Sequence, residues 1–176
     1  LAMFQPDALV AFEHEGALWL ATANEGEARE GTIDEAITLD QARAMASGGE
    51  AKAIPEGRLL VSSVPAPATF GGRFCAFGTR SMSLWRVDLA AIGAAPERPA
   101  IVLAWDSGEI IERMVAERTP ALFNADPRRT AKVDARSLSK GPEPEGVALA
   151  EIDGRRLLIV TLERSSGVTI FDATDP

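Results

Sequence analysis

An internal repeat constrains the fold of this chain more than any other sequence feature. Residues 6–16, followed by residues 18–22, match residues 144–154, followed by residues 157–161. Each copy reads proline, acidic residue, apolar tract, glycine turn and a second apolar tract. Recurring units of short strands with variable insertions are typical of β-propeller blades, which take about 40–50 residues for four strands. The repeat therefore predicts propeller blades.

Short apolar tracts between clusters of Gly, Pro, Asp and Ser predict antiparallel strands. They lie near residues 8–14, 17–23, 58–64, 73–78, 82–88, 100–105, 146–152, 156–162 and 167–172. Helical periodicity is limited to residues 34–45 and 110–116. The chain is thus predicted to be all-β, with short helices or irregular loops confined to insertions.

The repeat also suggests how the blades divide the chain. We expect one blade to begin near Ala8, a second near Arg58 and a third near Val147, with long insertions at residues 25–57 and 107–142. The third blade has no room for its last strand, so the whole chain amounts to a partial β-propeller of about two and a half four-stranded blades, an interior fragment of one domain. The remaining blades of the parent chain or a partner chain would close the ring. A complete β-sandwich is the alternative.

Composition excludes several classes of function. The chain has 18 Lys plus Arg against 26 Asp plus Glu, a net charge of -8, which gives nucleic acid no basic surface. One cysteine and one histidine exclude an intrachain disulfide, a cysteine-based zinc site and a histidine-pair metal site. The longest apolar runs are too short to span a membrane, and residues 1–5 carry no signal-peptide pattern.

Polar residues gather at one end of the predicted blades. In a four-stranded meander, the loop that enters the first strand and the loop between the second and third strands lie at the same end. These loops contain Asp7, Asn24, Glu25, Arg29, Arg80, Asp106, Arg136, Lys140, Glu143, Glu145, Glu163 and Arg164. The turns at the other end are simple hairpins, so the first end is the predicted functional face.

The residue types at this face indicate two kinds of chemistry. Carboxylates without histidine or cysteine favour calcium, and the predicted ligands are Glu25, Glu143, Glu145 and Glu163. Arginine forks bind two phosphate oxygens at once, and Arg29, Arg80 and Arg164, with Lys140 as a point charge, are the predicted phosphate contacts. The same glutamates and arginines could instead pair with one another and tie adjacent blades together.

Several motifs resemble, in order, the pattern of the choice-of-anchor I family. They include Asn24-Glu25-Gly26, Phe77-Gly78-Thr79-Arg80-Ser81, Lys140-Gly141-Pro142-Glu143-Pro144-Glu145-Gly146 and Leu162-Glu163-Arg164. The resemblance covers essentially the whole chain. It implies a bacterial β-propeller protein that is secreted, periplasmic or on the cell surface, from a family often labelled alkaline phosphatase. Those labels imply phosphoester or calcium chemistry.

Two hypotheses for the function follow. In the first, the protein is a metal-dependent phosphoester hydrolase in which the cation activates water, Arg29, Arg80, Arg164 and Lys140 stabilise the phosphoryl charge, and Glu143 or Glu145 is the general base. In the second, it is a noncatalytic surface propeller that binds calcium, an anionic polymer or a protein partner.

Overall fold

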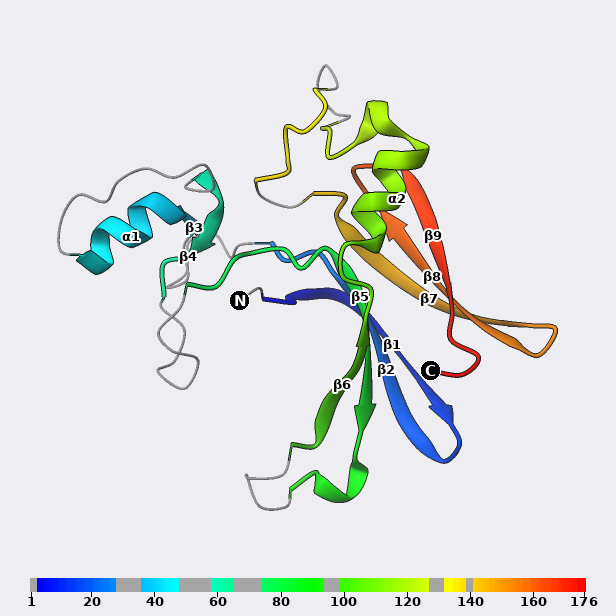
Figure 1. The fold of residues 1–176 in the computed structure, drawn as a ribbon. Coiled ribbons are helices and arrows are strands. Elements are labelled where there is room, and N and C mark those ends of the chain that lie inside the picture. Colours follow the sequence, from blue (N-terminus) through cyan, green and yellow to red (C-terminus); the bar gives the residue numbers. More distant parts are fainter. Residues whose placement is uncertain are drawn as a thin grey trace.

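The computed structural model describes residues 3–27, 36–47, 58–64, 74–93, 99–126, 132–138 and 141–176. Strands dominate these residues, and the helices are short (Figure 1). In chain order the elements are β1 (Pro6–His14), β2 (Ala17–Asn24), β3 (Ala36–Thr38), α1 (Leu39–Ser47), β4 (Leu60–Ser62), β5 (Ser81–Val87), a 3-10 helix (Leu89–Ala91), β6 (Ile101–Asp106), α2 (Ile110–Arg118), a second 3-10 helix (Pro120–Leu122), β7 (Pro144–Ile152), β8 (Arg155–Leu162) and β9 (Gly167–Asp172).

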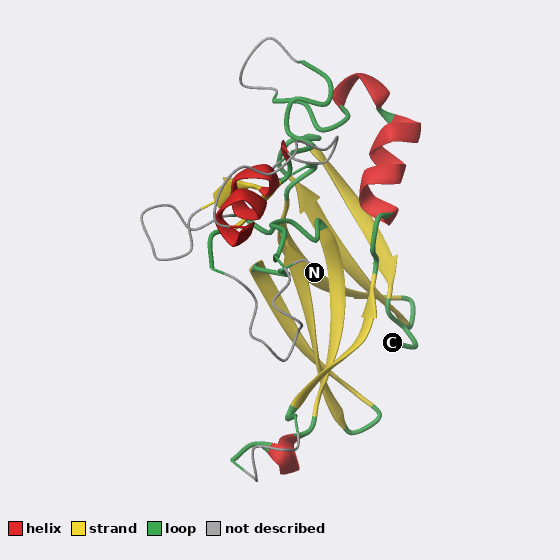
Figure 2. Cartoon of the chain, turned by 60° about the vertical axis from the view of Figure 1, so that its left-hand side comes forward, coloured by secondary structure: helices red, strands yellow, loops and turns green. Residues whose placement is uncertain are grey.

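The strands form three antiparallel sheets. The first blade has the strand order β1-β2-β5-β6, and the second blade has the order β7-β8-β9. The third sheet is a two-stranded pair, β3-β4, that lies with α1 to one side of the blades (Figures 1 and 2). This arrangement confirms the all-β, partial propeller-like class, and the described residues form no closed ring.

The expected blade beginning near Arg58 is wrong. Strands β5 and β6 are the third and fourth strands of the first blade, because β2 pairs with β5 from Leu18–Val87 to Asn24–Ser81. The insertion between β2 and β5 is therefore longer than predicted and includes β3, α1 and β4. Clusters of Gly and Pro mark where strands begin and end. They carry no information on which strands pair across a long insertion.

Two local predictions also need correction. Within the expected strand 73–78, the described residues make only one isolated bridge, Ala76 to Val61. The expected helix 34–45 begins later, as α1 at Leu39, after the short strand β3. Residues 34, 35 and 73 lie outside the described residues.

The repeat is confirmed in the hydrogen-bond register. In the first hairpin Pro6 pairs with Asn24 and His14 with Ala17. In the second, Pro144 pairs with Leu162, and the last pair before the turn is Ile152 with Arg155. The residue numbers of equivalent positions differ by the same amount along both strands of the hairpin. Leu157 is therefore the structural equivalent of Trp19. The match made from the sequence is displaced by one residue in the second strand.

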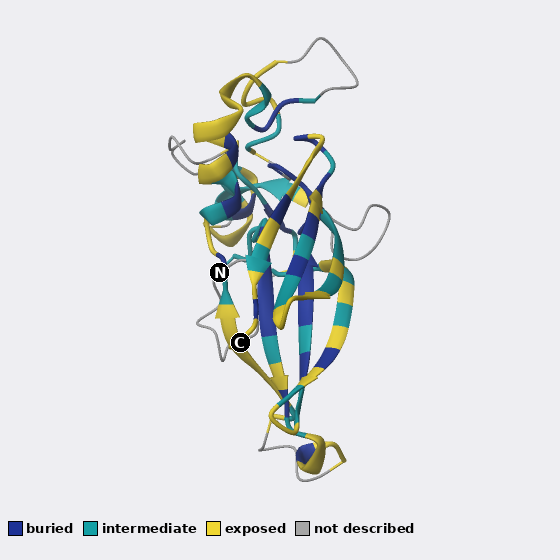
Figure 3. Cartoon of the chain, turned by 90° about the vertical axis from the view of Figure 1, so that its right-hand side faces the viewer, coloured by how far each residue is buried: buried dark blue, intermediate teal, exposed yellow. Residues whose placement is uncertain are grey.

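The two blades pack head to tail. On β2 the side chains of Trp19 and Ala21 enter the shared core, whereas on β8 those of Leu158 and Val160 do so. Because Leu157 is the equivalent of Trp19, the two strands bury opposite faces. Figure 3 shows the alternation of buried and exposed positions along the strands. The first blade therefore contacts the second through one face, and the second contacts the first through its opposite face. Blades stack in a propeller by this kind of heterologous contact.

Contacts at both ends of the strands reinforce the packing of the blades. Helix α2 follows β6 and buries Ile111 and Val115, one turn apart on one helix face, in the core. At the hairpin end, the Arg156 guanidinium on β8 lies 3.2 Å from His14 Nδ1 and stacks over the Phe12 ring of β1 at 4.8 Å. These contacts join the first blade to the second and place the polar loops of both blades at the opposite end.

Candidate functional site

Each blade opens with the same local backbone. Gln5 and Glu143, the residues before the opening prolines, have φ angles of 41° and 54°. The pairing with the next strand then shifts by one residue, so that Asp7 and Glu145 are the extra residues of two equivalent β-bulges. A positive φ is unfavourable for residues other than glycine and recurs at functional sites. The bulge aims one acidic residue per blade at the polar end.

Carboxylates from the two blades meet at this end. The first blade contributes Asp7 and the buried Glu25 after β2, and the second blade contributes Glu145 and the equivalent Glu163 after β8. Burial raises the pKa of Glu145 to about 7, and a hydrogen bond with Glu163 and the negative charges of Glu163, Glu25 and Asp7 act in the same direction. Oxygen atoms of Glu25, Glu143 and Glu145 lie within 4.8 Å of one another.

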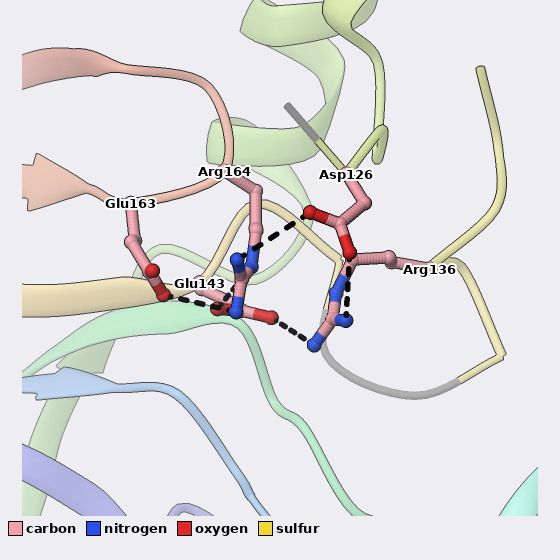
Figure 4. A network of polar contacts seen from close by, with 5 residues as sticks. All are labelled: Asp126, Arg136, Glu143, Glu163 and Arg164. Carbon is pink, nitrogen blue, oxygen red and sulfur yellow. Dashed lines mark hydrogen bonds and ion pairs between the residues drawn. The ribbon is translucent and has the colours of Figure 1, made fainter. Parts of the chain in front are cut away.

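Glu143 differs from the other carboxylates because arginines hold both of its oxygens (Figure 4). The Arg164 Nε donates to Glu143 Oε2 at 2.6 Å, and an Arg136 nitrogen donates to Oε1 at 2.5 Å. Glu143 is fully buried, and Asp126 lies 3.7 Å and 3.9 Å from the two guanidinium groups.

Arg164 also links this ion-pair network to the carboxylate cluster. Its NH2 group lies 3.1 Å from Glu163 Oε2. Burial opposes the positive charge of Arg164, but the hydrogen bond to Glu143 and the neighbouring carboxylates raise its pKa. Arg164 therefore keeps its charge and is fixed between Glu143 and Glu163.

Arg80 belongs to a second network. It adopts a φ of 55° and donates to Glu112 Oε1 at 2.8 Å and to the Ser137 carbonyl at 2.5 Å. The Asn124 amide donates to the same Glu112 oxygen at 2.7 Å. A side chain at Gly141 would meet Arg80 Cδ at 2.7 Å, so the loop before β7 packs closely on this arginine. The network ties α2 to the loops before β7.

The predicted site residues therefore separate into groups. Glu25, Glu143 and Glu145 bring their oxygens together, and Glu163 adjoins them through its hydrogen bond with Glu145. Glu143 is also the centre of the adjoining ion-pair network. Arg80 and Arg164 are both hydrogen-bonded to carboxylates, as the alternative of internal pairing predicted. The predicted phosphate contacts Arg29 and Lys140 lie outside the described residues.

Asp106, which was expected at the functional face, has a structural role. Its Oδ2 accepts hydrogen bonds from the Ser81 and Ser83 hydroxyls at 2.8 Å and 2.6 Å. The same hydroxyls accept from the buried Asn24 amide. This chain of hydrogen bonds crosses β2, β5 and β6 and holds the polar end of the first blade together.

Sequence reasoning missed three participants in these networks. Asp7 was placed at the polar face but not among the metal ligands, although it occupies the repeat position of Glu145. Aligning the two copies would have found it. Asp126 and Glu112 pair with arginines that are distant in the sequence, and no local pattern marks either of them.

The donor set of the cluster suits a hard cation. Its glutamates offer carboxylate oxygen, which calcium and magnesium prefer. Bonds to calcium of about 2.3–2.6 Å place two ligand oxygens up to about 5 Å apart, whereas bonds to magnesium of about 2.1 Å allow only about 4 Å. The residues that could hold such an ion are Glu25, Glu143 and Glu145, with Asp7 and Glu163 beside them.

Comparisons with known proteins agree with the fold and the motifs. The family model of the choice-of-anchor I domain matches residues 1–176. A mesenchyme-specific cell surface glycoprotein of Strongylocentrotus purpuratus is 34% identical over 115 residues, which cover 61% of this chain and 14% of that protein. Gigasin-3a of Magallana gigas is 37% identical over 71 residues, which cover 38% of this chain and 25% of that protein. No solved structure matches.

The chain therefore spans only a minor part of the curated relatives that it matches. In the part of the chain that the structure describes, no helix has the length and apolar character needed to cross a membrane.

Proposed function

The chain belongs to the choice-of-anchor I domain family, and from that premise we propose that it is part of a surface or secreted β-propeller that binds calcium between two blades without catalysing a reaction. The family and the cell-surface relative support the location at the surface or outside the cell. The carboxylates at equivalent positions of the two blades support the ligand.

The convergence of glutamates from both blades carries the proposal, and the raised pKa of Glu145 agrees with it. A carboxyl group keeps its proton near neutral pH when burial and nearby negative charges oppose ionisation. At Glu145 these are burial and the charges of Glu163, Glu25 and Asp7, which bring the pKa to about 7. A divalent cation placed among these groups would remove both the repulsion and the proton, so the cluster has a large electrostatic gain from binding one.

Calcium would supply an electrostatic cross-link between blades at this position. Asp7 and Glu25 come from the first hairpin and Glu145 and Glu163 from the second, so a shared ion would join the two polar ends. Its binding energy would add to the stability of the folded protein, by about 2.7 kcal/mol when free calcium is 100 times the Kd.

The arginines argue for binding rather than hydrolysis. A phosphoryl transition state is stabilised by guanidinium groups whose donors are already aimed at its oxygens. Arg80 and Arg164 instead donate to Glu112, Ser137 and Glu143 inside the protein. The phosphoester hydrolase and the binding of an anionic polymer or a protein partner stay predictions from the sequence.

Calcium titration of the 176-residue chain by isothermal calorimetry tests the proposal. We expect saturable binding that Glu145→Gln and Glu163→Gln each weaken by about tenfold, since each removes one charged ligand. Glu13→Gln removes the same charge from an exposed position on β1 and should leave the affinity unchanged. Absence of calcium binding by the folded protein would refute the proposal.

The same preparations distinguish binding from hydrolysis. Release of phosphate from a phosphomonoester, measured with calcium and with chelator, should stay at the background rate for all variants. Calcium-dependent turnover lost in Arg80→Ala and Glu145→Gln would support the hydrolase instead.

A further inference from the structure

Helix α2 and the second blade form a small cavity, partly open to solvent, that none of the predicted calcium ligands lines. Its volume is about 180 Å³, and its apolar lining includes the buried Ile111 and Val115 and the exposed Val168. An apolar cavity of about 150 Å³ in a protein core takes up a molecule as large as benzene. The cavity is therefore large enough for a small organic molecule.

Two residues that line this cavity, Ser165 and Thr169, carry hydroxyl groups without strong partners. Ser165 is 8% exposed, and its Oγ has no hydrogen-bond partner among the described residues. Thr169 is 5% exposed, and its hydroxyl lies 3.9 Å from the Met114 sulfur, which is a weak acceptor. Because buried hydroxyls are normally hydrogen-bonded, the Ser165 hydroxyl is a donor that a ligand at this cavity could satisfy.

A positive charge lies at the solvent side of the cavity. Arg118, in the last turn of α2, is exposed and contributes to the lining. Its guanidinium forms no ion pair with any residue that the structure describes, unlike that of Arg113 earlier on the same helix, which lies 3.6 Å from Glu109. The cavity therefore combines an apolar wall, a buried hydroxyl donor and a guanidinium that is available to an anion.

We propose that this cavity binds a small carboxylate with an apolar tail, of the size of a short-chain fatty acid. The tail packs among Ile111, Val115 and Val168, and the carboxylate accepts hydrogen bonds from Ser165 and Arg118. An alcohol of the same chain length would bury the same tail but would lose the charged contact with Arg118. The inference is independent of the calcium site.

Hexanoate is a suitable probe, with hexanol as the neutral comparison, in calcium-free buffer. We expect hexanoate to shift the amide resonances of Val115, Ser165 and Thr169 in a saturable manner. Arg118→Gln should weaken hexanoate binding about fivefold and leave hexanol unaffected, because an exposed ion pair contributes a modest free energy. Ser165→Ala should weaken the binding of both probes, because it removes the buried donor.

Arg113→Gln is the matched control on the same helix and should bind hexanoate as the unmodified protein does. Both arginines are on the protein surface, so neither variant should prevent folding. Two results would overturn the proposal: hexanoate leaves the three amides unshifted, in which case the cavity holds water only, or Arg118→Gln and Arg113→Gln bind hexanoate equally well.

Discussion

The two blades use one backbone design with different side chains at a few equivalent positions. Both have a residue with positive φ before the opening proline, an acidic bulge residue and a glutamate after the second strand. They differ at the two positions that form the buried ion pair of the second blade. Where that blade has Glu143 and Arg164, the first has Gln5 and Gly26.

This difference separates structural charges from candidate ligands. Glu143 and Arg164 occur together in the second blade and are both replaced in the first, as expected of a pair whose members need each other. The acidic bulge residue and the glutamate after the second strand are present in both blades, although their charges repel one another. The described structure shows no structural benefit of this repulsion. The shared carboxylates are therefore the better candidates for a ligand site.

The largest expected effect is the loss of the buried ion pair. Glu143→Ala should lower the free energy of unfolding by about 3–5 kcal/mol, because it leaves the buried Arg164 without its main partner. Gln5→Ala, at the equivalent position, should cost less than about 1 kcal/mol, since Gln5 Oε1 has no hydrogen-bond partner among the described residues. Urea unfolding of both variants measures the difference. Equal losses would contradict the assignment of Glu143 as a structural anchor.

Gly26 tests the other differing position. A Cβ there would lie 2.0 Å from Gly78 Cα, and its φ of 71° disfavours any side chain. Gly26→Ala should therefore cost about 2–4 kcal/mol from overpacking and backbone strain. Gly16→Ala has a similar φ of 74° but meets nothing within 4 Å, and should cost about 1 kcal/mol. Thermal unfolding of both variants measures the difference between the two stability costs. A Gly26→Ala variant as stable as Gly16→Ala would show that the close approach to Gly78 is easily relieved.

The carboxylate cluster should make stability fall as pH rises. The pKa of Glu145 in the folded protein is raised from 4.5 to about 7, so the folded state holds a proton that the unfolded state releases. The stabilisation that this proton contributes is therefore fully present below about pH 4.5 and is lost as the pH rises to about 7. Glu145→Gln should flatten this part of the stability curve in calcium-free buffer, whereas Glu13→Gln should not. A slope unchanged in Glu145→Gln would place the titrating group elsewhere.

The smallest effect is expected at Asp172, at the end of β9. Hydrogen bonds from Thr174 and Arg155 lower its pKa to about 2. The stabilisation is present above the ordinary pKa of an aspartate and is lost as pH falls toward 2. Asp172→Asn should slightly reduce stability at neutral pH and abolish this loss in acid, and Arg155→Gln should show part of the same change. Indistinguishable acid unfolding curves for Asp172→Asn and the unmodified protein would contradict this account.

The sequence predicted the strands well because alternating apolar tracts and glycine turns are local signals. It also identified the hairpin that recurs from Pro6 and Pro144, since the same residue types return at a constant offset. It placed β5 and β6 in the wrong blade because their pairing with β2 depends on a long insertion. Strand pairing across such an insertion is set by packing, which no short sequence pattern reports.

The candidate site could be predicted only in part. The loops that carry Glu25, Glu145 and Glu163 were expected at one end, because their position follows from strand order. The partners of the arginines could not be predicted, because Asp126 and Glu112 approach Arg164 and Arg80 only after α2 and its following loop fold onto the blades.

A double-mutant cycle on calcium affinity tests the central claim most directly. Asp7→Asn removes a carboxylate of the first blade and Glu145→Gln its equivalent in the second. If both groups hold one ion, each single variant binds more weakly, and the double variant departs from the product of the two effects by more than about twofold. Effects that multiply independently, or a folded protein that binds no calcium, would contradict a shared site between the blades.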